Sequence, residues 1–144
     1  MILDDIQVAL KDAMKASKKD EISTFRMLIA SLNNQKIAKK GELTDKDAIA
    51  VLRTEVKKRD EAAQAYKEAG RVSSAEKEGT EKEIIKRFLP EEISDEALVK
   101  IVDEVISGAG EDKQFGPLMQ QVMTKVGGAA DGSRVSKLLK EKIT

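Results

Sequence analysis

Apolar side chains recur every third or fourth residue along nearly the whole chain, and no stretch alternates apolar and polar residues as a β-strand does. Each such stretch predicts an amphipathic helix whose apolar stripe needs a partner to cover it. The pattern therefore predicts an all-α fold, with four helices up to Leu89 and three more that form a small tail.

The first four helices are expected at residues 3–17, 20–40, 44–69 and 73–89. In the first helix the residues expected to face inward are Leu3, Ile6, Leu10 and Met14. In the second they are Ile22, Phe25, Ile29, Leu32 and Ile37. Thr44 followed by Asp47 predicts a capping box at the start of the third helix. Two further capping boxes, Ser73 with Glu76 and Thr80 with Glu83, lie on either side of Gly79, so we expect the fourth helix to be broken there.

A domain boundary is expected at Pro90, because proline disfavours helical geometry in the residue before it and lacks an amide hydrogen. The charged pair Glu91-Glu92 follows, and Ser94 then offers a cap for a fifth helix over residues 94–108. We therefore expect an N-terminal helical domain over residues 1–90 and a three-helix tail domain over residues 91–144.

The tail ends in two short helices, expected at 115–126 and 133–143, joined by the glycine-rich segment Gly127–Gly132, which we call the corner. Gly127 and Gly128 favour the left-handed backbone that ends a helix, and Asp131 can cap the next one. The purely structural interpretation is that the segment only turns the chain between two helices, as in a helix-turn-helix corner. The functional one is that the corner brings backbone amides close to a phosphate, with nearby basic residues holding it.

Composition excludes most catalytic and metal-binding chemistry. The chain has no histidine, no cysteine and no tryptophan, so it lacks imidazole bases, thiolate nucleophiles and the usual zinc or haem ligands. We expect no catalytic residue, no metal and no cofactor. No apolar run reaches the length of a membrane span and no signal peptide is recognisable, so we expect a cytoplasmic protein without a membrane partner.

Charge is balanced overall but unevenly distributed. The 26 basic and 26 acidic residues cancel, so the total does not indicate nucleic-acid binding. Between Glu91 and Asp112 the charged residues are acidic except for Lys100, whereas basic residues dominate from Phe115 onwards. A second basic run, Lys57-Lys58-Arg59, lies in the third expected helix; it is a secondary candidate patch for nucleic acid, although such runs usually form a solvated face.

The corner carries a spaced set of residues that resembles the C-terminal signature of the GatB/YqeY family: Met123, Val126, Gly128, Ala130, Asp131, Gly132, Val135 and Leu138. Further matches are Arg26-Met27-Leu28, Lys57-Lys58-Arg59-Asp60, Ala69-Gly70-Arg71 and Leu89-Pro90-Glu91-Glu92 with Ser94-Asp95-Glu96. Together they make the chain similar to free-standing YqeY-like proteins. In this family the C-terminal part resembles the tail domain of GatB, a component of the glutamyl-tRNA(Gln)/aspartyl-tRNA(Asn) amidotransferase; that tail contacts tRNA without performing chemistry.

The resemblance implies a non-catalytic accessory protein that binds tRNA or a tRNA-modifying or aminoacylation complex. The family label, a carbon–nitrogen ligase activity with glutamine as amido-N donor, has no supporting residues in this chain. The implied RNA-binding residues are Lys125, Gly128, Asp131, Gly132, Arg134 and Lys137. Two positions depart from the family pattern, since Ala129 and Pro117 stand where the family more often has basic residues. The alternative is a helical protein–protein interaction module without an RNA role.

Overall fold

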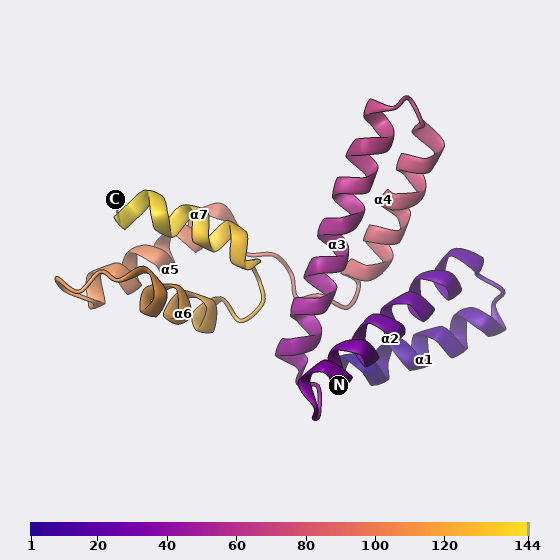
Figure 1. Ribbon diagram of the computed structural model, residues 1–144, viewed down its shortest axis with the longest axis horizontal. Helices are drawn as coiled ribbons and strands as arrows, with labels where there is room; N and C mark the ends of the chain where they lie inside the picture. The colour runs from indigo at the N-terminus through magenta and orange to yellow at the C-terminus, as the bar shows by residue number, and fades with distance from the viewer. Residues whose placement is uncertain (144) are drawn as a thin grey trace. The chain divides into compact units, whose positions relative to one another are not determined.

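The computed structural model of the protein describes residues 1–143, and all regular structure in them is helical (Figure 1). The helices are α1 (Ile2–Lys15), α2 (Lys19–Lys39), α3 (Asp45–Glu68), α4 (Val72–Lys86), α5 (Asp95–Gly108), α6 (Phe115–Val126) and α7 (Gly132–Ile143). The described residues contain no strand, and the predicted all-α fold is confirmed.

Contacts along the chain divide it into two compact units, Met1–Leu89 and Pro90–Thr144. The division falls one residue before the expected domain boundary. Each unit has a hydrophobic core of its own. Whether each unit also folds independently stays a prediction.

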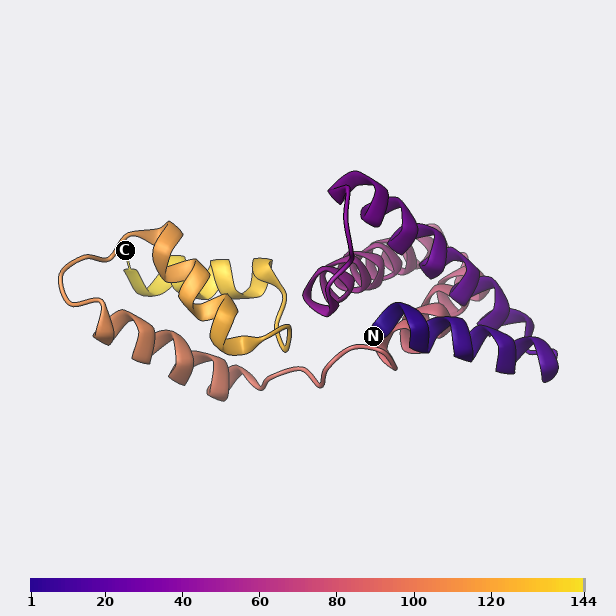
Figure 2. The same ribbon diagram turned by 90° about the horizontal axis from the view of Figure 1, so that it is seen from below.

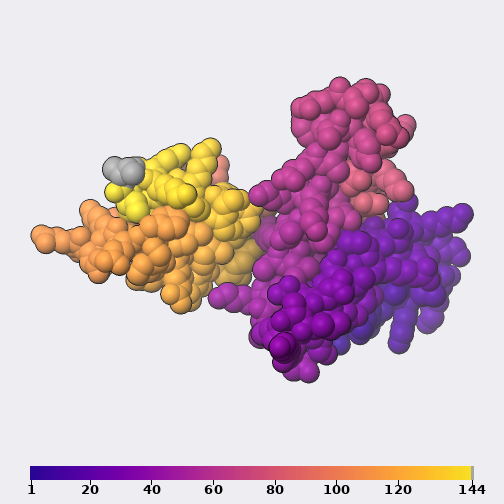
Figure 3. Space-filling model, viewed as in Figure 1, coloured from indigo at the N-terminus to yellow at the C-terminus, as the bar shows by residue number. Residues whose placement is uncertain are grey.

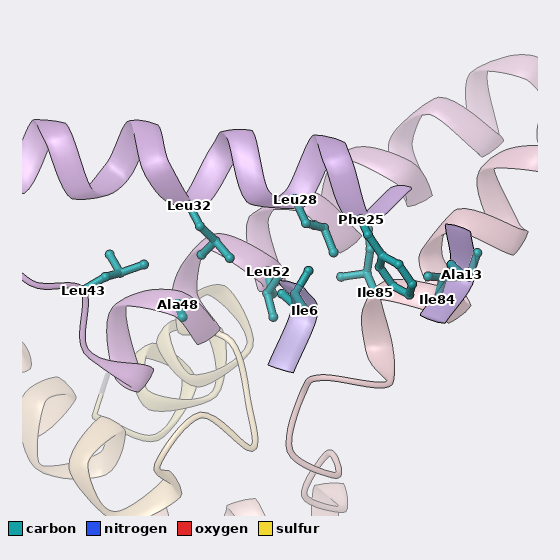
Figure 4. Close-up of a cluster of buried hydrophobic side chains, with 10 residues drawn as sticks. All are labelled: Ile6, Ala13, Phe25, Leu28, Leu32, Leu43, Ala48, Leu52, Ile84 and Ile85. Atoms are coloured by element: carbon teal, nitrogen blue, oxygen red, sulfur yellow. The ribbon is translucent and has the colours of Figure 1, made fainter. Parts of the chain in front are cut away.

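The first unit consists of two helical hairpins. α1 and α2 lie side by side in both ribbon views (Figures 1 and 2). Figure 4 shows Leu28 and Leu32 of α2 pointing towards Leu52 of α3 and Ile6 of α1, and all four side chains are fully buried. The far half of the α3–α4 hairpin stands clear of α1 and α2 (Figure 3).

The start of α3 is fixed by the predicted capping box. The Thr44 hydroxyl oxygen accepts the Asp47 amide at 3.1 Å, and the Asp47 carboxylate accepts the Thr44 amide at 3.1 Å. The same carboxylate lies 2.5 Å from the Lys39 ammonium at the end of α2. A local cap and an inter-helix ion pair therefore meet on one aspartate, which ties the end of α2 to the start of α3.

The predicted break in α4 is wrong. α4 runs without interruption from Val72 to Lys86 and passes through Gly79. Its N-cap is Arg71, so Ser73 lies inside the first turn, and the Thr80 hydroxyl donates to the Glu76 carbonyl oxygen at 3.1 Å. Packing along α3 outweighs the roughly 1 kcal/mol that a glycine costs within a helix.

Two expected core residues are exposed instead. Ala13 is buried in place of Met14, because Ala13 lies seven residues after Ile6 and so shares its face. Ile37 has 73% of its surface exposed, since five residues after Leu32 the helix has turned roughly 140° away from the core. Helical phase, rather than hydrophobicity, selects which apolar residue is buried.

The second unit is a three-helix tail. Its buried core residues come from all three helices and from the corner: Leu98, Val102, Val105, Leu118, Val122, Val126, Ala130, Val135 and Leu139. The Ser94 hydroxyl oxygen accepts the Ala97 amide at 3.2 Å and so caps α5 as predicted. Among residues 1–143 no helix is both long and apolar enough to cross a bilayer.

Candidate nucleic-acid interface

The corner is built by two consecutive glycines with left-handed or related backbone geometry. Gly127 ends α6 with φ 56° and ψ 30°, and its amide donates to the Met123 carbonyl oxygen at 3.1 Å. Gly128 follows with φ 94°. A residue with a Cβ adopts such angles only with strain, so glycine is favoured at these two positions, where the chain leaves α6.

Asp131 fixes the other end of the corner by capping α7. Its Oδ1 accepts the backbone amide of Arg134 at 2.8 Å and the hydroxyl of Ser133 at 2.9 Å. The predicted cap is therefore present. Gly132 opens α7, and a Cβ built there meets only the Met119 Cε at 3.8 Å, an ordinary contact. Glycine at 132 is thus not required by the packing of residues that the structure describes.

A feature that no sequence pattern indicates ties the corner to the start of the tail. The Ile93 amide donates to the Ala129 carbonyl oxygen at 2.8 Å, and the Ile93 side chain packs on the tail core. The next corner residue, Ala130, is buried. Because this backbone bond joins residues far apart in the chain, local spacing carries no signal for it. The corner is therefore anchored at both ends and in its middle.

The basic residues of the tail differ in whether an acidic side chain pairs with them. The Arg134 guanidinium lies 2.6 Å from the Asp95 carboxylate of α5, and Lys142 lies 2.9 Å from Asp103. Lys125 and Lys137 are exposed, and neither forms an ion pair within the described chain. Lys125 and Lys137 thus offer their full charge to solvent on the two sides of the corner, whereas that of Arg134 is shared with Asp95.

The secondary basic patch, Lys57 to Arg59, is largely engaged by acids. Arg59 lies 2.5 Å from Glu55 and 3.5 Å from Glu81, and Lys58 lies 3.5 Å from Glu55. The Glu55 side chain is only 8% exposed and also accepts the Ser31 hydroxyl at 3.2 Å. This network connects α2, α3 and α4, and Lys57 is the member of the patch that remains exposed without an ion pair in the described residues.

The pKa values of Glu21 and Asp47 are displaced, and both displacements oppose acid catalysis. The hydrogen bond from Arg87 lowers the pKa of Glu21. The hydrogen bond from Lys39, with those from Thr44, lowers the pKa of Asp47 to about 2. A general acid at neutral pH needs a raised pKa. Residues 1–143 also contain no group of three acidic side chains placed to hold a metal ion.

The chain is similar to known proteins, one family model over almost its entire length and individual relatives over all or part of it. A model of the family described as "Yqey-like protein" matches residues 3–143. "Uncharacterized protein C22F3.15" of Schizosaccharomyces pombe is 34% identical over 89 residues, which cover 62% of this chain and 72% of that protein. "Altered inheritance of mitochondria protein 41, mitochondrial" of Pyrenophora tritici-repentis is 24% identical over 147 residues, which cover 99% of this chain and 81% of that protein.

Proposed function

The chain belongs to the YqeY-like protein family, and we propose that it is a non-catalytic accessory protein whose tail binds tRNA, alone or within a tRNA-modifying or aminoacylation complex. One observation carries the proposal. Lys125 and Lys137 are exposed and uncompensated in the described residues, and the anchored corner lies between them in the chain. Ammonium groups held on a rigid frame suit phosphate contacts on a folded RNA that is recognised by shape.

The chain lacks the side chains that amide transfer from glutamine usually uses. An amide transfer from glutamine needs an activated nucleophile, and the chain has neither cysteine nor a histidine base. The displaced pKa values keep Glu21 and Asp47 ionised at neutral pH. Purified protein should therefore release no ammonia from glutamine.

The charges around the corner favour weak binding. Asp131 and Asp95 place two carboxylates beside Arg134, and they repel phosphate. Ala129 adds no charge. We expect tRNA binding that is detectable at low salt and falls steeply as salt rises.

The test compares tRNA binding by the natural protein with that by a Lys125→Gln/Lys137→Gln double variant. Fluorescence anisotropy with a labelled tRNA transcript is measured over a salt series. The double variant should bind more weakly at low salt, and its log–log salt slope should be shallower by about two, because two phosphate contacts are lost. Its unfolding free energy should be nearly unchanged, because exposed charges contribute little to folding.

A Lys11→Gln/Lys15→Gln variant is the matched control, since both lysines are exposed on α1 in the first unit. It removes the same charge and should change binding much less. Equal losses in the two double variants, or no binding at low salt, would contradict the proposal. Ala129→Arg supplies the complementary gain, because it adds a cation at the corner.

A protein-interaction module is the second candidate, and the outer face of α6 favours it. Apart from Lys125 near its end, the exposed residues of this face carry no charge, in a chain that is 36% charged: Gly116, Pro117, Gln120, Gln121 and Thr124. Depletion of charge is typical of the core of a protein interface. A pull-down from the native cytosol with and without nuclease distinguishes the candidates, because partners held by a protein interface persist after nuclease treatment. We propose a cytosolic location for this protein, whereas the name of the P. tritici-repentis relative places that relative in the mitochondrion.

A further inference from the structure

The pair formed by Asp95 and Arg134 has an unequal exposure. The Asp95 side chain is 93% exposed, whereas that of Arg134 is 28% exposed. Asp95 is the first residue of α5, and Arg134 lies in the first turn of α7. The contact at 2.6 Å therefore bridges two helices, with the carboxylate as its outer member and the guanidinium held against the tail.

This arrangement places a competing anion on Arg134, a basic residue two positions after the corner. The backbone amide of Arg134 is bound by Asp131, which keeps the residue in place, while its guanidinium is directed to Asp95. A phosphate that approaches Arg134 must displace the Asp95 carboxylate or lie beside it. An ion pair at the surface is weak, so a phosphate can displace the Asp95 carboxylate. Breaking the pair nevertheless reduces the free energy gained when the phosphate binds.

We infer that Asp95 limits the strength of phosphate binding at the corner by occupying Arg134. The inference rests on the proposed function and adds a positioning residue to it: Asp95 acts through Arg134 and makes no favourable contact with RNA itself. Neutralising Asp95 should free the guanidinium for a phosphate and remove a nearby negative charge.

Binding of a tRNA transcript to Asp95→Asn at low salt is the first measurement. Affinity should rise about two- to fivefold, the range that corresponds to the strength of an exposed ion pair. The salt slope should steepen by about one, because one more cation then contacts phosphate. Glu96→Gln is the matched control. It removes the same charge from the next residue, also exposed in the first turn of α5 and without an ion pair in the described residues, and should change affinity less than about twofold.

Two further variants show whether the effect passes through Arg134. In an Arg134→Gln background, Asp95→Asn should give no more gain than Glu96→Gln does, because no guanidinium remains to be freed. Asp95→Glu keeps the carboxylate and should bind like the natural protein.

The outcomes distinguish a failure of the role of Asp95 from a failure of tRNA binding itself. Binding by the natural protein with equal gains from Asp95→Asn and Glu96→Gln overturns this inference and leaves the proposed function standing. An Asp95→Asn gain that persists without Arg134 also overturns it. Absence of binding at low salt in the natural protein and in every variant overturns the proposed function itself.

Discussion

Gly128 is the residue at which the corner is most sensitive to a side chain, because its φ of 94° is one that other residues rarely adopt. Gly128→Ala should therefore lower the unfolding free energy of the tail by about 1 kcal/mol or more. Denaturant unfolding of the protein measures this loss.

Gly116→Ala provides the control for Gly128→Ala. Gly116 lies in the first turn of α6, and a Cβ there meets no atom within 4 Å. Alanine should be neutral or stabilising at 116. Equal effects at both positions would show that strain at Gly128 is not the cause.

Asp47 should give the protein an acid-dependent contribution to stability. Its folded pKa of about 2 lies below the ordinary value of 3.8, chiefly through the hydrogen bond from Lys39. A lowered pKa means that the ionised form is favoured by folding. The contribution is complete above about pH 4 and is lost as pH falls towards 2.

Unfolding free energies of the natural protein and Asp47→Asn, measured at several pH values, test this. The difference between the two proteins should be largest at neutral pH and shrink as pH falls from about 4 to about 2. Asp12→Asn, an exposed acid on α1, should show no comparable change. A constant difference for Asp47→Asn over that range would contradict the assignment.

Three of the five helix caps that single residues predict are present in the structure. Thr44, Ser94 and Asp131 are each expected to cap a helix and each does, because a cap reaches only three residues along the chain. Neither the Asp95–Arg134 pair nor the Ile93–Ala129 bond is foreseeable in this way. They join residues more than about thirty positions apart, and their formation depends on how the tail helices pack.

At the scale of the helices, the α3–α4 hairpin contains two glycines with opposite requirements. Gly79 lies inside α4, where a Cβ meets nothing within 4 Å, and Gly70 follows α3 with φ 75°. Gly79→Ala should raise the unfolding free energy by about 0.5–1 kcal/mol through helix propensity. Gly70→Ala should lower it, and thermal unfolding of both variants measures the contrast. Destabilisation by Gly79→Ala would indicate that α4 needs flexibility at that position.

The same hairpin shows why some helix bounds could not be predicted. Ser73 with Glu76 and Thr80 with Glu83 have the spacing of capping boxes, yet both hydroxyl residues lie within α4. A capping pattern indicates that a residue can cap a helix if the helix begins there, whereas packing on α3 determines where α4 begins. Apolar periodicity still placed every helix, because amphipathic stripes record packing partners rather than single bonds.

At the scale of the whole molecule, the two compact units should each fold alone. The core of each is formed within its own unit, and the segment between them is short and charged. Limited proteolysis should cut near Glu91 and Glu92, and fragments 1–90 and 91–144 should each unfold cooperatively. Protection of residues 89–94 with cleavage elsewhere would indicate a single fused domain.

Only residues 90–92 lie between Leu89, where the first unit ends, and Ile93, which is hydrogen-bonded to Ala129 of the corner. Three extended residues span at most about 10 Å. When two binding sites are joined by a short covalent connection, the second site meets a shared partner at an effective concentration in roughly the millimolar range. A partner with sites for both units therefore gains avidity from two weak contacts. Glycine and serine residues inserted after Pro90 should reduce this gain in avidity, and a longer insertion should reduce it more.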